Sequence, residues 1–234
     1  MDILGKALLD FQTGDYTEDI KTFSSLNEED ILEVPYLFRN FNEMPLIEQK
    51  ALAFCQGNVL DVGCGAGSHS LYLQENGFEV VGLDQSKGAI KVCKERGVKK
   101  TVCAEFLNFS ETGFDTLLLL MNGIGISGKL ERLAEFLNHT KKLLNPGGQL
   151  ILDSSDIIYM FEKDEDGGYW VPGDTPYYGE VRFQMGYKRK KGPIFDWLYL
   201  DFNTLKNTAE NAKWRCEMIC EGNHYDYLAR LTLK

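Results

Sequence analysis

From residue 58 onward, short apolar runs alternate with stretches of helical periodicity. Residues 59–62 and 79–83 are two such runs, and a helical pattern at 68–75 separates them. Buried strands that alternate with helices are typical of parallel βαβ units, whose sheets are covered on both faces. The pattern continues with predicted strands and helices at 87–96 (helix), 100–104 (strand), 116–121 (strand), 129–144 (helix) and 149–153 (strand). The sequence therefore predicts an α/β fold with a doubly wound sheet of five parallel strands.

After the fifth strand the apolar period changes to two. Large apolar side chains occupy every second position of 181–187 and again of 195–199, on either side of a basic turn. This alternation predicts an antiparallel hairpin inserted into the fold. A predicted helix at 203–213 and two strands at 215–220 and 225–232 follow. The complete expectation is a mostly parallel, seven-stranded sheet with a C-terminal antiparallel hairpin and an extra hairpin insertion.

The first 50 residues have a different character. They mix acidic and aromatic side chains with weak helical periodicity, and Pro35 and Pro45 interrupt them. A chain of 234 residues is long enough for one sizeable core. We therefore predict a helical N-terminal lead-in, or lid, at 1–50 and a catalytic domain at 51–234, with an insertion at about 157–201.

The overall charge narrows the range of partners. A formal net charge of −10 disfavours binding to nucleic acid, because such affinity comes from neutralising phosphates with Lys and Arg. The chain has no apolar run of membrane-spanning length, and Met1–Asp10 does not resemble a secretion signal. Its six cysteines include no C-x-x-C pair, so neither a disulfide framework nor a metal site is predicted. We expect a cytoplasmic protein that acts on a small molecule, of unassigned oligomeric state.

A glycine-rich turn follows the first parallel strand. Gly63, Gly65 and Gly67 stand between that strand and the next helix. Glycines in such a turn let backbone N–H groups approach a ligand closely. Asp84 ends the second strand about 20 residues later, where a carboxylate can bind the two ribose hydroxyls of a nucleotide. The turn and Asp84 together predict a nucleotide-containing ligand.

The spacing of the glycines distinguishes between two ligands. A dinucleotide fingerprint needs its third glycine at position 68, which is Ser68 here. Asp61, at the end of the first strand, would repel a pyrophosphate but would attract the ammonium group of an amino acid. A ligand that joins adenosine to an amino acid fits both carboxylates, so a nicotinamide oxidoreductase is the less favoured interpretation.

Residues 59–84, together with Asn145–Asp153 and the C-terminal hairpin, resemble the class I S-adenosylmethionine-dependent methyltransferases. The resemblance covers about residues 45–234 and implies S-adenosylmethionine as the cofactor. It implies that the methionine part lies among Asp61, Gly63, Cys64, Gly65 and Gly67. It also places Asp84 at the ribose, Gln85, Glu105 and Phe106 at the adenine, and Asn122 and Gly123 beneath the sulfonium.

The cofactor implies the reaction class. A sulfonium methyl group is already activated, so in-line transfer depends mainly on alignment and exclusion of water. No catalytic residue is assigned, because a general base is needed only where the acceptor must lose a proton. The branches of the family that methylate nucleobase amino groups carry two prolines and an aromatic residue after the position of Asn122, and this chain has Gly123-Ile124-Gly125. We expect a small-molecule methyltransferase, with a non-catalytic cofactor-binding protein as the alternative.

Two aromatic-rich segments can reach the ligand-binding edge of such a sheet. They are residues 11–41 and 159–178, and we expect them to enclose the methyl acceptor and exclude water. The candidate acceptor contacts are Tyr36, Arg39, Tyr159 and Trp170. Arg39 is the candidate to hold an anionic group of the acceptor or the carboxylate of the cofactor.

Overall fold

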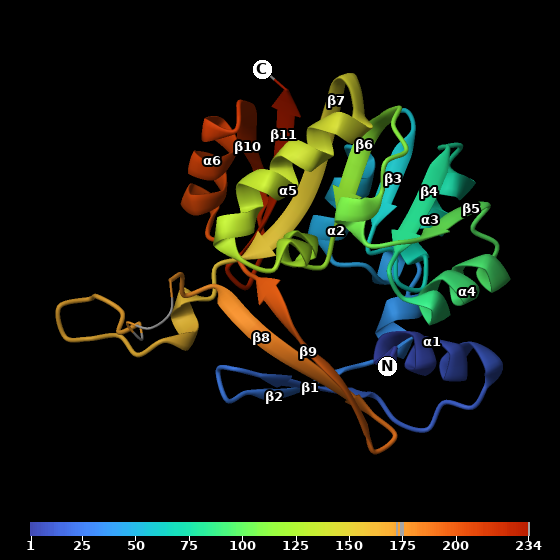
Figure 1. Ribbon diagram of the computed structural model, residues 1–234, viewed down its shortest axis with the longest axis horizontal. Helices are drawn as coiled ribbons and strands as arrows, with labels where there is room; N and C mark the ends of the chain where they lie inside the picture. Colours follow the sequence, from blue (N-terminus) through green and yellow to red (C-terminus); the bar gives the residue numbers. More distant parts are fainter. Residues whose placement is uncertain (172, 174–175, 234) are drawn as a thin grey trace.

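Two sheets make up the protein, and one lies beneath the other (Figure 1). The computed structural model describes residues 1–171, 173 and 176–233. A seven-stranded sheet has the order β10-β11-β7-β6-β3-β4-β5, and a four-stranded sheet has the order β2-β1-β8-β9. Among the described residues, no helix is both long and apolar enough to cross a membrane.

The large sheet has the predicted topology. Five neighbouring strands, from β7 to β5, are parallel. Strand β11 is antiparallel to β7, and β10 is antiparallel to β11, so β11 alone runs against the others. The predicted mostly parallel sheet with a C-terminal hairpin is confirmed. The strands are β3 (Val59–Val62), β4 (Val80–Asp84), β5 (Lys100–Cys103), β6 (Phe114–Leu119), β7 (Leu144–Ser155), β10 (Trp214–Glu221) and β11 (Asp226–Leu233).

Helices cover both faces of this sheet. Successive side chains of a strand point to opposite faces, so Leu117 joins the core beneath α5 and α6 while Leu118 joins the core beneath α2 and α3. Helix α4 begins at Lys87, because the Ser86 hydroxyl accepts the Ala89 N–H, and it ends at Gly97 in a left-handed conformation. The helices are α2 (Leu46–Ala53), α3 (Ser68–Glu75), α4 (Lys87–Arg96), α5 (Leu130–Leu143) and α6 (Phe202–Asn211), with 3₁₀ turns η1 (Pro35–Phe38), η2 (Phe41–Glu43), η3 (Phe106–Asn108), η4 (Gly123–Ser127) and η5 (Ile158–Met160).

The small sheet corrects one expectation. The predicted hairpin is present as β8 (Glu180–Tyr187) and β9 (Lys190–Leu198). The lead-in, however, is not purely helical, since β1 (Ile20–Ser24) and β2 (Glu29–Leu32) follow α1 (Ile3–Thr13). Strand β1 pairs with β8, with Lys21 opposite Gly186. Hydrogen bonds from this distant strand stabilise an extended conformation that the weak local periodicity does not indicate.

The small sheet is fixed against the carboxyl edge of the large one. Trp197 on β9 packs directly on Gly125 of η4, where a Cβ atom would lie 2.1 Å from the indole ring. Helix α1 is fixed in turn to α4, because the Asp2 carboxylate accepts hydrogen bonds from Ser86 Oγ at 2.8 Å and from the Gly88 N–H at 3.0 Å. The carboxyl edge is thus covered by β8–β9 on one side and by α1 on the other (Figure 1).

Candidate functional site

A cavity of about 740 Å³ lies between the two sheets. Its lining comes from the loop after β3, the loop after β6, the end of β7 and the inner face of the small sheet. This volume is in the range of small-molecule sites, and the carboxyl ends of parallel strands are where such folds bind ligands. Asp61, Gly63, Cys64 and Gly65 line the cavity, as do Asn122 and Gly123.

The three glycines of the loop have different surroundings. All have a positive φ, +75° at Gly63, +53° at Gly65 and +85° at Gly67. A Cβ atom on Gly65 would meet no atom closer than 3.9 Å, so it would project into the open cavity. A Cβ atom on Gly67 would lie 2.9 Å from Val98 and 3.0 Å from the Cys93 sulfur. Gly65 therefore leaves room for a ligand, whereas Gly67 allows the loop to pack against α4.

Asp84 holds the glycine loop in place through a hydrogen bond. Its carboxylate accepts the Gly65 N–H at 3.0 Å and the Ser86 N–H at 2.8 Å. Burial raises the pKa of Asp84, and these two N–H groups lower it only in part. Asp84, Gln85 and Glu105 lie beside the described lining of the cavity and not in it. Gln85 and Glu105 are exposed, and Glu105 accepts a hydrogen bond from Asn108 at 3.0 Å.

Phe106 has a different environment from the one that the resemblance implied. Its ring is buried and lies 4.8 Å from the ring of Phe136 and 5.0 Å from that of His139, both on α5. The side chain belongs to the core beneath α5. The Phe106 ring thus packs in the core, and its contact with an adenine stays a prediction.

Asp61 is almost completely buried at the end of β3. The Ser70 hydroxyl donates to its carboxylate at 2.6 Å. Burial raises the pKa of Asp61, while His69 and Ser70 lower it in part. A buried carboxylate beside a cavity is suited to a cationic group such as the ammonium of an amino acid.

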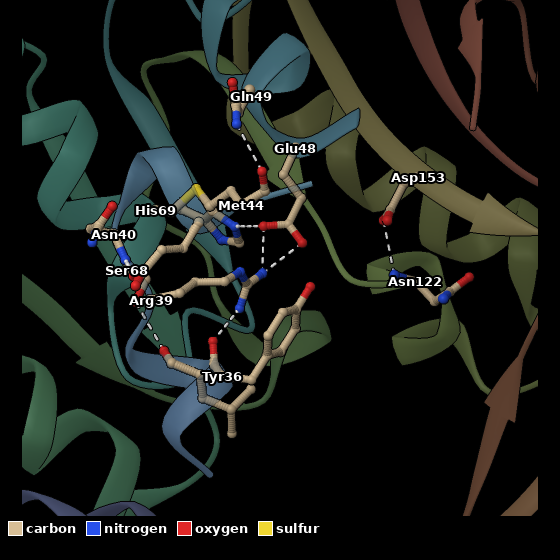
Figure 2. Close-up of polar contacts among 12 residues, drawn as sticks. Tyr36, Arg39, Asn40, Met44, Glu48, Gln49, Ser68, His69, Asn122 and Asp153 are labelled. Atoms are coloured by element: carbon tan, nitrogen blue, oxygen red, sulfur yellow. Dashed lines mark hydrogen bonds and ion pairs between the residues drawn. The ribbon is translucent and has the colours of Figure 1, made fainter. Parts of the chain in front are cut away.

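Three buried polar side chains gather beside the glycine loop (Figure 2). Glu48 accepts hydrogen bonds from Arg39 through both oxygens, one at 2.6 Å, and contacts His69 Nε2 at 2.8 Å. Arg39 also donates to the Tyr36 carbonyl at 2.7 Å, and its guanidinium lies 4.0 Å from the centre of the Tyr36 ring. We call Arg39, Glu48 and His69 the Glu48 cluster.

The Glu48 cluster changes the role expected of Arg39. Arg39 lines the cavity, but Glu48 already neutralises its charge. Burial alone would raise the pKa of Glu48, but His69 and Arg39 outweigh it, so that pKa lies below its ordinary value. Glu48 could not be recognised from the sequence, because a single glutamate in a helix is normally exposed.

Asp153 is a second buried carboxylate of the cavity lining that the sequence did not reveal. It lies at the end of β7, and its carboxylate accepts the Asn122 N–H at 2.9 Å. Met121 and Asn122 both have φ near +60°, so this contact holds a left-handed turn beside the cavity. Burial and the nearby charge of Glu48 raise the pKa of Asp153 to about 7. A group with such a pKa exchanges protons readily near neutral pH.

The predicted lid has a different composition from the expected one. Tyr36 and Tyr159 line the cavity, but Trp170 is 66% exposed on a loop that projects away from the two sheets (Figure 1). Residues 172, 174 and 175 of the predicted lid lie outside the described residues. The wall opposite the glycine loop is formed instead by the inner face of the hairpin, with Val181, Phe183, Met185, Phe195, Trp197 and Tyr199.

Two residues of the cavity lining each carry a polar atom that has no hydrogen-bond partner among the described residues. Within the part of the chain that the structure describes, Asn122 Oδ1 and Arg39 Nε are buried and form no hydrogen bond. Buried polar groups in proteins are nearly always satisfied, so such atoms indicate a missing partner. Together with the open space beside Gly65, they fit a ligand with both donors and acceptors, as the methionine part of S-adenosylmethionine has.

The chain resembles known methyltransferases in both sequence and structure. The model of the methyltransferase domain family matches residues 60–152. A crystal structure of a SAM-dependent methyltransferase from Bacteroides fragilis, in complex with S-adenosyl-L-homocysteine, is 46% identical to this chain. The two superpose with a TM-score of 0.92, over 99% of this chain and 94% of the other.

Curated relatives match over a shorter stretch. The cypemycin N-terminal methyltransferase of a Streptomyces species is 32% identical over 103 residues, which are 42% of this chain and 42% of that protein. The 23S rRNA (uracil(747)-C(5))-methyltransferase of Pyrococcus horikoshii is 30% identical over 86 residues, which are 34% of this chain and 21% of that protein. The chain therefore spans less than half the length of these curated relatives.

Proposed function

Because this chain belongs to the class I S-adenosylmethionine-dependent methyltransferases, we propose that it methylates a small molecule held in the cavity between its two sheets. The recognition of the family from residues 59–84 is confirmed, and the cofactor is S-adenosylmethionine. The proposal that the acceptor is a small molecule rests on the geometry of the site alone.

The enclosure of the cavity supports a small acceptor. One wall is the glycine loop, and the opposite wall is the aromatic inner face of β8 and β9. A polymer such as RNA needs an open, basic surface, whereas this chain has a net charge of −10. One observation carries the proposal: the small sheet covers the carboxyl edge and leaves a cavity of about 740 Å³ beneath it.

The residues of the site align the two reactants and exclude water. When bound, the cofactor supplies an activated methyl group that an acceptor can displace. Gly65 and Asn122 would hold its methionine part, and Asp84 would bind the ribose or hold the loop that does. The aromatic wall keeps water from the acceptor, which favours transfer because it avoids competing solvation.

The proposed function is tested by following a labelled methyl group. The protein is incubated with methyl-labelled S-adenosylmethionine and a cell extract, and the extract is then separated into small-molecule, protein and RNA fractions. We expect label to enter the small-molecule fraction in an enzyme-dependent manner. Label confined to RNA or to protein would contradict the small-molecule acceptor while leaving the family unchanged.

Asp84→Ala is expected to weaken S-adenosylhomocysteine binding by about tenfold or more. A charge-assisted hydrogen bond contributes on the order of 1.5–3 kcal/mol. The substitution also releases the Gly65 N–H, which Asp84 accepts at 3.0 Å. Titration calorimetry measures the change. A folded variant with unchanged affinity would remove Asp84 from the site.

Hydrogen exchange tests which segments enclose the ligands. With S-adenosylhomocysteine added, we expect residues 20–39 and the hairpin at 180–199 to gain protection, because both line the cavity. The exposed stretch at 162–170 serves as the control and should not change. Protection of the glycine loop without protection of the hairpin would show that the small sheet does not close on the site.

A further inference from the structure

Carboxylates dominate the charge of the cavity. Among the described residues that line the cavity, Arg39 is the single Lys or Arg side chain, and it already forms an ion pair with Glu48. Two histidines, His69 and His224, are the other basic groups there. Against them stand six carboxylates: Glu28, Asp30, Glu48, Asp61, Asp153 and Asp226.

This imbalance produces a negative potential where the acceptor must bind. Low-dielectric walls focus the field of buried charges into a cleft, which concentrates ligands of the opposite sign. Asp61 is assigned to the ammonium group of the cofactor, which leaves Asp153 as a buried carboxylate that forms no ion pair within the described residues. An anionic acceptor would be repelled by Asp153, whereas a cation would relieve its unfavourable burial.

The wall opposite the glycine loop adds a second preference for cations. Phe195 lies between Phe183 and Trp197 on the inner face of the hairpin, with ring centroids 6.2 Å apart in each pair. Tyr199 extends the row, at 6.3 Å from Phe183. The faces of aromatic rings attract ammonium groups, and sites built from several rings recognise alkylated amines. Carboxylates and aromatic rings thus line the same cavity.

From this combination we propose that the methyl acceptor is a small-molecule amine that enters as an ammonium ion, and that Asp153 receives it. This inference rests on the proposed function and specifies its acceptor. In Figure 2 the carboxylates of Glu48 and Asp153 and the hydroxyl of Tyr36 point toward a common region, and all three residues line the cavity. Burial raises the pKa of Tyr36, and the negative charges of Glu48 and Asp153 raise it further, which agrees with this arrangement.

Asp153 is suited to more than binding. An ammonium nitrogen has no lone pair, so it must lose a proton before methylation. The ammonium gives this proton to the Asp153 carboxylate. The nitrogen lone pair then forms the N–C bond while the methyl–sulfur bond breaks and its electron pair stays on sulfur, which yields the N-methylated ammonium and S-adenosylhomocysteine. The groups that face Asp153 are Glu48 on α2, His69 on α3, Tyr36 on η1 and the N–H groups of Asn122 and Gly123.

Matched probes test the charge of the acceptor. S-adenosylhomocysteine is first titrated into the protein, and the loaded protein is then titrated with 2-phenylethylamine, 2-phenylethanol and 3-phenylpropanoate, and with their cyclohexyl counterparts. We expect the amine of each set to bind about tenfold more tightly than the alcohol, and the carboxylate to bind most weakly. The proposal is overturned if the amines bind no better than the alcohols or carboxylates, or do not bind.

Two variants test which carboxylate produces the preference for amines. Asp153→Asn should bring the amine within about threefold of the alcohol, because the ratio of the two affinities depends on the carboxylate charge. Asp196→Asn is the control, since Asp196 lies on the same hairpin as the aromatic wall but outside the cavity lining and should keep the full preference. Should Asp153→Asn not fold, the double variant Glu28→Gln with Asp30→Asn is used, and it should reduce the preference by a few fold.

The outcomes separate the two proposals. A preference for amines that neither Asp153→Asn nor the double variant reduces would overturn the role given to the acidic lining. Binding of S-adenosylhomocysteine without any preference for amines overturns this inference alone. Failure of the protein to bind S-adenosylhomocysteine would instead overturn the proposed function.

Discussion

Gly65→Val is expected to abolish S-adenosylhomocysteine binding, with a rise in Kd of at least about a hundredfold, or about 2.7 kcal/mol. A Cβ atom at this position would project into the cavity, with no neighbour closer than 3.9 Å. The branched side chain would therefore occupy space that the ligand needs, and the backbone φ of +53° would add strain of about 1–3 kcal/mol. Calorimetric titration measures the binding, and thermal unfolding measures the strain.

Gly77→Val is the matched control for this variant. Gly77 also has a left-handed backbone, with φ +87°, and a Cβ atom there would meet nothing within 4 Å. It follows α3 and does not line the cavity. We expect this variant to lose stability of similar size but to bind S-adenosylhomocysteine normally. If Gly65→Val binds as well as Gly77→Val does, the loop is a structural turn and not a ligand site.

Glu48→Ala is expected to lower the free energy of unfolding by about 3–5 kcal/mol. The substitution leaves the buried guanidinium of Arg39 without its counter-charge and removes the partner of His69. Urea unfolding at neutral pH measures this loss. Glu79→Ala is the control, because the ion pair of Glu79 with Lys100 is exposed and its loss should not shift the unfolding midpoint measurably.

The effect of Glu48→Ala should depend on pH. The pKa of Glu48 is lower in the folded protein than its ordinary value of 4.5. A carboxylate with a lowered pKa stabilises the fold above the unfolded-state pKa, and this contribution is lost as pH falls through the folded-state pKa. The stability difference between the unmodified protein and the variant should therefore narrow below about pH 4.5. A difference that stays constant to lower pH would show that packing, and not charge, holds the Glu48 cluster together.

The large sheet could be predicted because its signals are local. Each buried strand is a short apolar run, and the helices between the strands show their own periodicity and end at glycines such as Gly97. For the small sheet, only the hairpin could be predicted. The hairpin of β8 and β9 has a clear period of two, but β1 is defined by pairing with β8, more than 150 residues away. Local periodicity carries no information about such a partner.

The residues of the site likewise fall into those that the sequence predicts and those that it does not. The glycine loop and Asp61 follow directly from the pattern of strand, turn and helix. Glu48 and Asp153 do not, because their importance comes from burial beside groups on other elements. The aromatic-rich composition of residues 159–178 predicts Trp170 near the acceptor, but the structure places Trp170 on a projecting loop, where it is exposed. The aromatic wall that faces the cavity lies on the hairpin, whose orientation over the carboxyl edge is a tertiary property.

The loop at Gly63–Gly67 is proposed to bind S-adenosylmethionine, and calorimetric titration with S-adenosylhomocysteine and NAD⁺ measures whether it does. We predict that S-adenosylhomocysteine binds the unmodified protein at a single site with micromolar or tighter affinity, and that NAD⁺ gives no heat of binding. Both ligands contain adenosine, so the comparison isolates the amino-acid part that Asp61 and Asn122 are proposed to recognise. Binding of NAD⁺ without binding of S-adenosylhomocysteine would show that the loop is a dinucleotide site and not a site for S-adenosylmethionine.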